Sequence, residues 1–166
     1  VARRACKQGL PIVWTAPSGL PVMQAYPEMT AYRVKTKFGD SIIRLTLCKE
    51  TEKLDPRRQT NGIAPNWVHS LDAAHLCLSI YIGAEHGIRS WAMVHDSYAT
   101  QAANVEIMQQ SLRVAFVEMY RDHDVLTEFR DAVATIMPGG VDDLPPIPET
   151  GTLDIMEVLK SDFFFA

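Results

Sequence analysis

The stretch Ile88-Arg-Ser-Trp-Ala-Met-Val-His-Asp-Ser-Tyr-Ala-Thr-Gln101 decides how the rest of this chain is interpreted. Residues 91–94 are mostly good β-formers, and they follow Gly87, a residue type that often ends a helix. His95 and Asp96 interrupt the apolar run, and residues 97–100 resume an extended pattern. The pattern predicts a β-hairpin with His95 and Asp96 at a two-residue tip.

The residues at this tip are unusual for a tight turn. Two-residue hairpin loops favour Asn-Gly or Asp-Gly, because these pairs adopt positive φ angles at little cost. His95-Asp96 is a poor turn former, which indicates that the side chains serve chemistry. The alternative is that Asp96 only stabilises the turn by bonding to its own backbone.

Three segments resemble the single-subunit DNA-directed RNA polymerases of bacteriophages and mitochondria. Val94-His-Asp-Ser97 resembles the third palm motif of that family, and Gly62-Ile-Ala-Pro-Asn-Trp-Val-His-Ser-Leu-Asp-Ala-Ala-His-Leu76 resembles the helix that leads into it. Ser161-Asp-Phe-Phe-Phe-Ala166 resembles the aromatic C-terminus. The resemblance implies an α+β fold, the C-terminal palm and fingers portion of a right-hand polymerase, with helices flanking the hairpin that carries the catalytic aspartate.

The resemblance also implies a chemistry. Nucleotidyl transfer uses two Mg²⁺ ions, and hard cations prefer carboxylates, so Asp96 is expected to be a catalytic metal ligand and His95 to position the tip. The family supplies a second aspartate, a lysine and a tyrosine that this sequence lacks. We therefore expect the C-terminal portion of a larger polymerase, inactive alone, whose partners are promoter and template DNA, RNA, ribonucleoside triphosphates and the missing N-terminal portion.

The residue after Asp96 separates two branches of polymerases. Polymerase I-type DNA polymerases resemble this motif but carry Glu there, so Ser97 favours RNA polymerases. The Asp162-Phe163 ending favours the bacteriophage type, and with it the host cytoplasm, over the mitochondrial type. Cys6, Cys48 and Cys77 are too few and too scattered for a disulfide framework, which also indicates a reducing compartment. The sequence shows neither a signal peptide nor an apolar run long enough for a membrane span.

Charge is distributed unevenly along the 166 residues, although the net charge is −4. Residues 1–60 hold eleven Lys or Arg and five Asp or Glu, a balance of +6, whereas residues 61–166 hold five and fifteen, a balance of −10. This asymmetry indicates that the first segment meets a polyanion. We expect a basic, β-rich segment over 1–60 and the palm portion over 61–166. The alternative is that the N-terminal cations are ordinary solvated loop charges.

A basic hairpin is predicted within the first segment. Residues 32–38 and 42–47 read as strands around Gly39-Asp40, and Arg33, Lys35 and Lys37 share one face because strand side chains alternate. In the resembled family the element at this position is the specificity hairpin, which reads promoter DNA, so Arg33, Lys35, Lys37 and Arg44 are candidate DNA-binding residues. The alternative is an edge hairpin whose lysines prevent aggregation.

A long helix is predicted from about Pro65 to Gly87, after a polar loop over 50–61. His69, Asp72 and His75 recur at three-residue steps, but they fan across about 120° of the helix, so we do not expect them to bind a metal together. The resemblance places His69 near the minor groove of the newly formed base pair.

The C-terminal third is predicted to hold helices over 105–120, 124–136 and 152–160, with a proline-rich connector over 142–150. Three consecutive phenylalanines end the chain before Ala166, so we expect the tail to dock with at least two rings buried. The resemblance implies that Phe165, Ala166 and the terminal carboxylate approach the active site; packing alone is the alternative.

Two other classes of function remain open at this point. One is a non-catalytic DNA-binding module, in which the first 60 residues matter and Asp96 is a turn residue. The other is a metal-dependent hydrolase that uses His69, His75, His95 and Asp96.

Overall fold

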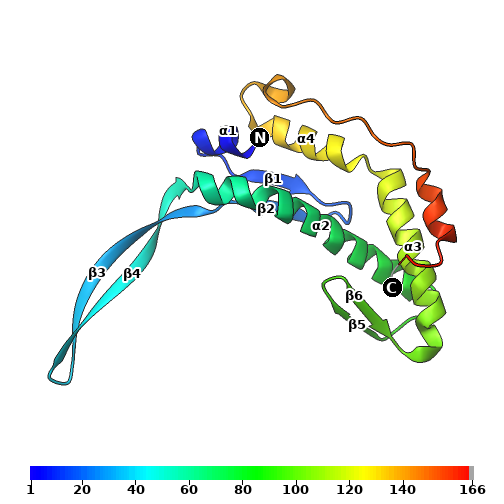
Figure 1. Ribbon diagram of the computed structural model, residues 1–166, viewed down its shortest axis with the longest axis horizontal. Coiled ribbons are helices and arrows are strands. Elements are labelled where there is room, and N and C mark those ends of the chain that lie inside the picture. The colour runs from blue at the N-terminus through cyan, green and yellow to red at the C-terminus, as the bar shows by residue number, and fades with distance from the viewer. Residues whose placement is uncertain (165–166) are drawn as a thin grey trace.

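The computed structural model describes residues 1–164 as an α+β chain, which confirms the predicted class. Its described strands form three separate antiparallel pairs, β1–β2, β3–β4 and β5–β6 (Figure 1). In chain order the elements are α1 (Ala2–Lys7), β1 (Ile12–Thr15), β2 (Pro21–Gln24), β3 (Pro27–Phe38), β4 (Ser41–Leu54), α2 (Pro56–Glu85), β5 (Trp91–Val94), β6 (Ser97–Thr100), η1 (Ala102–Asn104), α3 (Val105–Asp122), α4 (Val125–Ile136), η2 (Gly140–Asp143) and η3 (Ile155–Lys160).

The central element is α2, a continuous helix of 30 residues. Its N-cap is Asp55, whose carboxylate accepts hydrogen bonds from the backbone N–H groups of Arg57 and Arg58 at 2.9 and 3.0 Å. Pro56 follows at the first helical position, where its missing N–H costs nothing. The predicted start near Pro65 is therefore wrong: an Asp-Pro start signal occurs nine residues earlier, and Pro65 lies inside the helix.

The basic hairpin is longer than predicted and projects away from the N-terminal end of α2 as a two-stranded ribbon (Figure 1). The strand β4 runs to Leu54, so the loop predicted over 50–61 is wrong; residues 50–54 are strand and the rest belongs to the start of α2. The division expected at residue 60 consequently falls inside a helix.

A buried polar cluster holds the root of the ribbon against α2. The Gln24 amide nitrogen donates to the backbone and side-chain oxygens of Gln59 at 2.8 and 3.0 Å, and the Gln59 amide returns a bond to the Gln24 carbonyl at 3.1 Å. The Asn66 amide donates to Gln24 Oε1 and to the hydroxyl of Tyr26, both at 2.8 Å. These paired bonds fix where the chain enters the ribbon, since a buried amide without partners would be costly.

The main apolar cluster packs against the same stretch of α2, around Ile63 and Trp67. Its buried residues come from α1, β1, α4 and the following turn, and the Trp14 indole packs edge-on against Phe129 at 5.7 Å. Trp14 Nε1 also donates to Ser70 Oγ at 2.9 Å, so this cluster is tied to the middle of α2. The strands β1 and β2 lie in the segment over 1–60 that the sequence predicts to be β-rich, whereas the short helix α1 is not predicted.

The predicted hairpin around His95 and Asp96 is confirmed as β5 and β6, paired from Trp91↔Thr100 to Val94↔Ser97. Its inner face presents Trp91 and Tyr98 to a small core with Ile88, Met108 and Leu112. Glycine is required where this hairpin meets α2: a Cβ on Gly83 would lie 2.5 Å from the Trp91 ring.

The C-terminal helices match the predictions more closely. Asn104 precedes α3 and Asp124 caps α4, accepting from the Thr127 N–H at 3.2 Å. The final predicted helix is a shorter 3₁₀ turn, η3. Of the three terminal rings, Phe164 is half-buried and Phe163 is 85% exposed. Phe165 lies outside the described residues together with Ala166, so the burial of at least two rings stays a prediction.

Replacing Gly83 with alanine tests how the hairpin is seated. The added methyl group forces Trp91 outward, and overpacking of this kind costs about 1–3 kcal/mol, partly offset by roughly 1 kcal/mol of helix propensity. We expect a lower Tm by calorimetry, at roughly 2–4 °C per kcal/mol for a chain of this size. Gly151→Ala is the matched control, because no atom lies within 4 Å of its Cβ position. Equal Tm values for the two variants contradict this packing.

Candidate active site

An open cleft separates the middle of α2 from the tip of the β5–β6 hairpin. It has a volume of about 590 Å³ and is lined by six residues, of which four carry chemistry: His69, Asp72, His95 and Asp96. All four side chains are exposed. The structure thus brings together three residues proposed from sequence, His69, His95 and Asp96, and adds Asp72 as a second carboxylate.

The tip of the hairpin is built on a strained backbone. His95 has a φ of +54°, and it is the only non-glycine residue with positive φ among residues 1–164. Positive φ at the first of two central positions is the pattern of a type II′ turn, which normally takes glycine there. A histidine at this position costs about 1–2 kcal/mol relative to glycine, and such strain clusters at functional sites.

The third histidine of the helix, His75, does not reach the cleft. Its side chain is buried, its Nε2 lies 2.9 Å from the Leu112 carbonyl oxygen, and its Nδ1 lies 3.2 Å from the Tyr98 hydroxyl. Burial lowers the pKa of His75, although the Leu112 carbonyl and Asp72 oppose the change. The hydrolase constellation of His69, His75, His95 and Asp96 is therefore not assembled, because His75 faces the core.

The acidic side chains of the cleft affect the pKa values of two nearby tyrosines. The pKa of Tyr98 is raised, first by burial and then by the negative charges of Asp72 and Asp96. Asp72 also contributes to the raised pKa of Tyr120 on α3, after burial. The two carboxylates therefore create one region of negative electrostatic potential, which attracts a cation.

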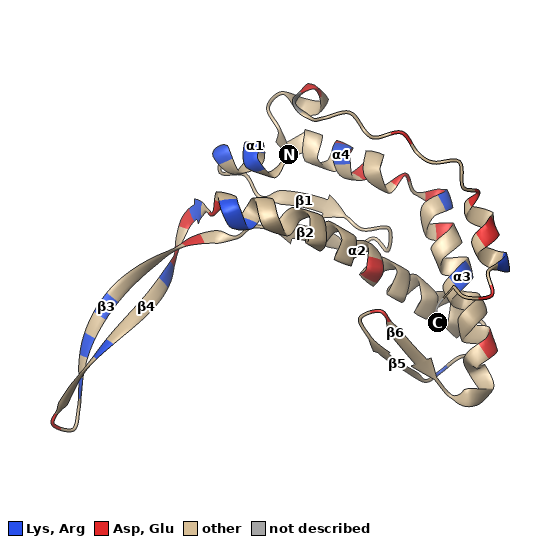
Figure 2. Cartoon of the chain, in the orientation of Figure 1, with Lys and Arg blue, Asp and Glu red and all other residues tan. Residues whose placement is uncertain are grey.

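The ribbon forms a second candidate site, and its root at the start of α2 lies about 20–24 Å along the helix from His69 and Asp72. Its register places Arg33 opposite Thr46, Lys35 opposite Arg44 and Lys37 opposite Ile42. Directly paired residues share a face of a sheet, so Arg33, Lys35, Lys37 and Arg44 lie on one face, as predicted. Blue segments along both strands in Figure 2 mark these cations.

The other face of the ribbon is apolar. The pairs Tyr32↔Leu47, Val34↔Leu45 and Thr36↔Ile43 alternate with the basic pairs, and Phe38 at the end of β3 is 77% exposed. The ribbon is thus amphipathic over residues 32–47: four cations share one face, and most of the large apolar side chains lie on the other.

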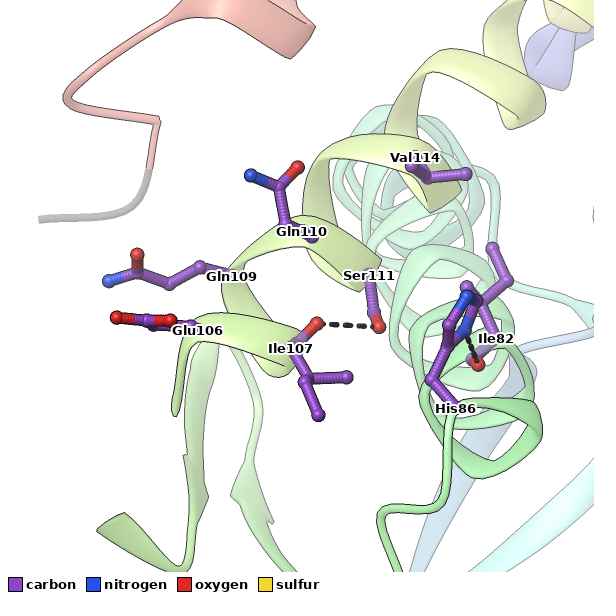
Figure 3. Close-up of a pocket in the computed structure, with 8 residues that line it drawn as sticks. All are labelled: Ile82, His86, Glu106, Ile107, Gln109, Gln110, Ser111 and Val114. Carbon is purple, nitrogen blue, oxygen red and sulfur yellow. Dashed lines mark hydrogen bonds between the residues drawn. The ribbon is translucent and has the colours of Figure 1, made fainter. Parts of the chain in front are cut away.

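A further groove lies between the end of α2 and the start of α3 (Figure 3). Its polar side chains bond back to their own helices: His86 Nδ1 lies 2.8 Å from the Ile82 carbonyl oxygen, and Ser111 Oγ donates to the Ile107 carbonyl at 2.8 Å. Glu106 and Gln109 point out of the groove in this view. This groove lacks the convergent polar groups of the α2–hairpin cleft.

Sequence reasoning missed the second carboxylate and the buried partner of the hairpin. Asp72 lies one helical turn from His69, so an i, i+3 pair on the helix that precedes the hairpin was the available signal. No comparable signal marked the His75–Tyr98 contact, because the two residues are 23 positions apart.

Comparisons with known proteins agree with this geometry. A model of the DNA-dependent RNA polymerase family matches residues 2–143. DNA-directed RNA polymerase 1A of Nicotiana tabacum is 41% identical over 157 residues, covering 93% of this chain and 95% of that protein. The mitochondrial DNA-directed RNA polymerase 1 of Nicotiana sylvestris is also 41% identical over 157 residues, which are 93% of this chain but 15% of that protein. The DNA-directed RNA polymerase of Enterobacteria phage K11 is 35% identical over 170 residues, 100% of this chain and 18% of that protein.

The family match places this α+β chain, whose carboxylate-tipped hairpin faces a long helix, among the polymerases. The chain is a member of the single-subunit DNA-directed RNA polymerase family, as its sequence resemblance predicted. It spans 15% and 18% of the length of the Nicotiana sylvestris and phage K11 relatives. None of the helices in residues 1–164 is long and apolar enough to cross a membrane.

The burial of His75 predicts how stability depends on pH. The pKa of His75 in the folded chain lies below its ordinary value of 6.5. At a pH between these two pKa values, the unfolded chain binds a proton at His75 and the folded chain does not. Stability is therefore full above about pH 6.5 and falls as the pH drops, with a slope of up to about 1.4 kcal/mol per unit. Urea unfolding from pH 5 to 8 should show a smaller slope for His75→Gln than for the wild type. Exposed His86, changed to Gln, is the control; identical slopes in all three proteins contradict the assignment.

The strain at His95 is measurable with two substitutions that both remove the imidazole. His95→Ala retains the unfavourable positive φ, whereas His95→Gly relieves it, so the glycine variant should be more stable by roughly 1 kcal/mol. Denaturant midpoints of the two variants give the difference. An alanine variant as stable as the glycine variant shows that the tip carries no strain.

Proposed function

We propose that this chain supplies the catalytic hairpin and a DNA-binding ribbon to a polymerase that carries out DNA-templated nucleotidyl transfer into RNA. The observation that carries the proposal is the cleft across which His95 and Asp96 of the hairpin face His69 and Asp72 of α2. Membership of the polymerase family supports the reaction type, and the named relatives are RNA polymerases, which favours RNA over DNA synthesis.

The donor set at the tip suits Mg²⁺. Asp96 and Asp72 are exposed carboxylates on one cleft, and hard divalent cations prefer such oxygen ligands with several waters retained. Within residues 1–164 there is no group of three or more His, Cys, Asp or Glu side chains that could by itself hold a metal. When bound, Mg²⁺ supplies positive charge that stabilises the attacking and leaving oxygens. Asp96 is the residue proposed to hold it, with further ligands from substrate and from the rest of the polymerase.

The remaining side chains of the cleft position the reactants. His95 shares the tip with Asp96 and is proposed to orient the tip or the 3′ end of the RNA. His69, on the opposite wall, has ring nitrogens that can bond the acceptors which every base pair shows in the minor groove. Asp72 adds negative charge beside Asp96, so it favours cation binding over binding of a bare phosphate.

The ribbon is proposed to contact promoter DNA through its basic face. A two-stranded ribbon fits the major groove, and four cations on one face, Arg33, Lys35, Lys37 and Arg44, suit a phosphate backbone.

The end of the chain is proposed to support the same site. Phe164 packs edge-on to His75 at 6.4 Å and to Phe116 at 5.1 Å, so the C-terminal segment reaches the base of the hairpin. Phe165 and Ala166 lie outside the described residues, and their approach to the active site stays a proposal. Ribonucleoside triphosphates, RNA and template DNA are the proposed ligands, and the host cytoplasm is the proposed location.

Removing the Asp96 carboxylate tests the catalytic proposal. In the polymerase that contains this chain, Asp96→Asn should reduce RNA synthesis by more than about 10³-fold, because the lost metal charge stabilises the transition state by several kcal/mol. DNA affinity should be largely unchanged, and His95→Ala should be less severe. Turnover is measured by incorporation of labelled nucleotide across a Mg²⁺ titration.

Asp131→Asn, an exposed carboxylate on α4, is the matched control and should leave turnover unchanged. Near-normal synthesis by Asp96→Asn would refute the assignment and leave Asp96 as a turn residue in a DNA-binding module.

Neutralising the basic face tests the ribbon. The triple variant Arg33→Gln, Lys35→Gln and Lys37→Gln should weaken promoter binding and flatten its salt dependence by up to about three in slope, roughly one per lost phosphate contact. Fluorescence anisotropy at several salt concentrations gives both quantities. Lys49→Gln is the control, because Lys49 pairs with Thr30 on the opposite face. If the triple variant behaves like the control, the ribbon does not bind DNA through this face.

A further inference from the structure

His75 lies where four parts of the chain meet. It belongs to α2, and it is 5% exposed. Its ring stands edge-to-face with Phe116 of α3 at 5.7 Å and 89°, and with Phe164 of the C-terminal segment at 6.4 Å and 88°. Tyr98 of β6 completes the surroundings at 5.9 Å. A polar ring in such a place needs both of its nitrogens bonded, since a buried polar group without a partner is costly.

The two hydrogen bonds of His75 have a defined direction. The Leu112 carbonyl can only accept, so Nε2 carries the proton and donates to it over 2.9 Å. In the neutral ring Nδ1 is then an acceptor, and the Tyr98 hydroxyl donates to it over 3.2 Å. Both bonds are made by a neutral imidazole and a neutral phenol, so the arrangement requires no ionised group.

The hydrogen bonds that run from Leu112 through His75 to Tyr98 end on the candidate catalytic hairpin. Tyr98 is two residues from Asp96 on β6, and it pairs with Met93 across the hairpin. An isolated hairpin with four-residue strands is marginally stable, so its position depends on what its inner face touches. Two contacts hold that face to α2: Trp91 against Gly83 near the open end, and Tyr98 against His75 nearer the tip.

The C-terminal segment packs against another side of the His75 ring. Arg113 of α3 donates from Nε and Nη2 to the Ser161 carbonyl at 3.1 and 2.9 Å, which holds the segment on α3. Its guanidinium also lies 6.0 Å from the centre of the Phe164 ring. Phe164 in turn packs against His75, so docking of the segment and placement of the hairpin share one side chain.

We propose that His75 is a positioning residue, which through the Tyr98 hydroxyl and the Leu112 carbonyl sets where the His95-Asp96 tip stands relative to α2. The inference rests on the proposed catalytic role of the tip. His75 touches neither substrate nor metal in this scheme; it acts by restricting the hairpin to one orientation.

Amide hydrogen exchange over residues 91–100 measures this restriction without depending on catalysis. In the polymerase that contains this chain, Tyr98→Phe removes only the hydroxyl and should speed exchange there roughly 2- to 10-fold, the range expected for one neutral hydrogen bond. Exchange in α4 should not change, because a local loss of restraint is not global destabilisation. Tyr120→Phe, a half-buried tyrosine on α3, is the matched control and should leave residues 91–100 unaffected.

A double-mutant cycle assigns the effect to the pair. In a His75→Leu background, Tyr98→Phe should add nothing, and His75→Gln, which keeps one donor and one acceptor, should restore part of the protection. If His75→Leu does not fold, Tyr98→Phe and His75→Gln still decide the matter. Unchanged exchange in Tyr98→Phe, or effects that simply add, would overturn the proposal.

Turnover gives the link to function. Tyr98→Phe should lower kcat by a factor similar to the change in exchange, with KM for nucleotides and Kd for template unchanged. Faster exchange with unchanged kcat refutes the positioning role. An active Asp96→Asn enzyme refutes the catalytic tip itself, and it does so without altering the exchange result, so the two failures are distinguishable.

Discussion

The continuity of α2 is the constraint on which the rest of the structure depends. The Asp55 carboxylate satisfies two N–H groups at its start, and from there 30 residues run without interruption past Pro65. Proline removes one internal hydrogen bond, so the helix must be held by its surroundings. The polar contacts of Gln59 precede Pro65, and those of Asn66 and the Trp14–Ser70 bond follow it. The ribbon and the cleft thus keep a fixed separation because both are attached to one rigid rod.

The cleft depends on a contrast between the two ends of the β5–β6 hairpin. At the open end, an apolar inner face and the missing side chain of Gly83 allow close packing on α2. At the tip, exposed His95 adopts a backbone conformation that glycine would adopt more cheaply. A sequence selected only to turn would place glycine there. The strained backbone at the tip lowers the stability of the fold, and the packing of the hairpin on α2 compensates for it. This combination keeps the side chains of a site both accessible and well placed.

The sequence predicts local features of this chain well and distant ones poorly. The hairpin tip, the basic face of the ribbon and the cap at Asp124 each depend on residues within a few positions, and all are found. The start of α2 was misplaced because Pro56 and Pro65 carry the same signal, and only tertiary support decides that the helix passes the second. His75 shows the limit most clearly: helical geometry places it about 120° around α2 from His69, but only the position of α3 determines that it meets the Leu112 carbonyl.

The two faces of the ribbon differ in chemical character. Its register puts four cations on one face and an apolar series on the other, from Tyr32 to Phe38 and from Ile43 to Leu47, and both faces are exposed. A two-stranded ribbon has no second layer of its own to bury the apolar face. Each Å² of that face left in water forgoes roughly 25 cal/mol of burial, so the ribbon depends on its strand pairing and on its root for support. The bonds between Gln24 and Gln59 supply that support, because they tie the entry of the ribbon to α2.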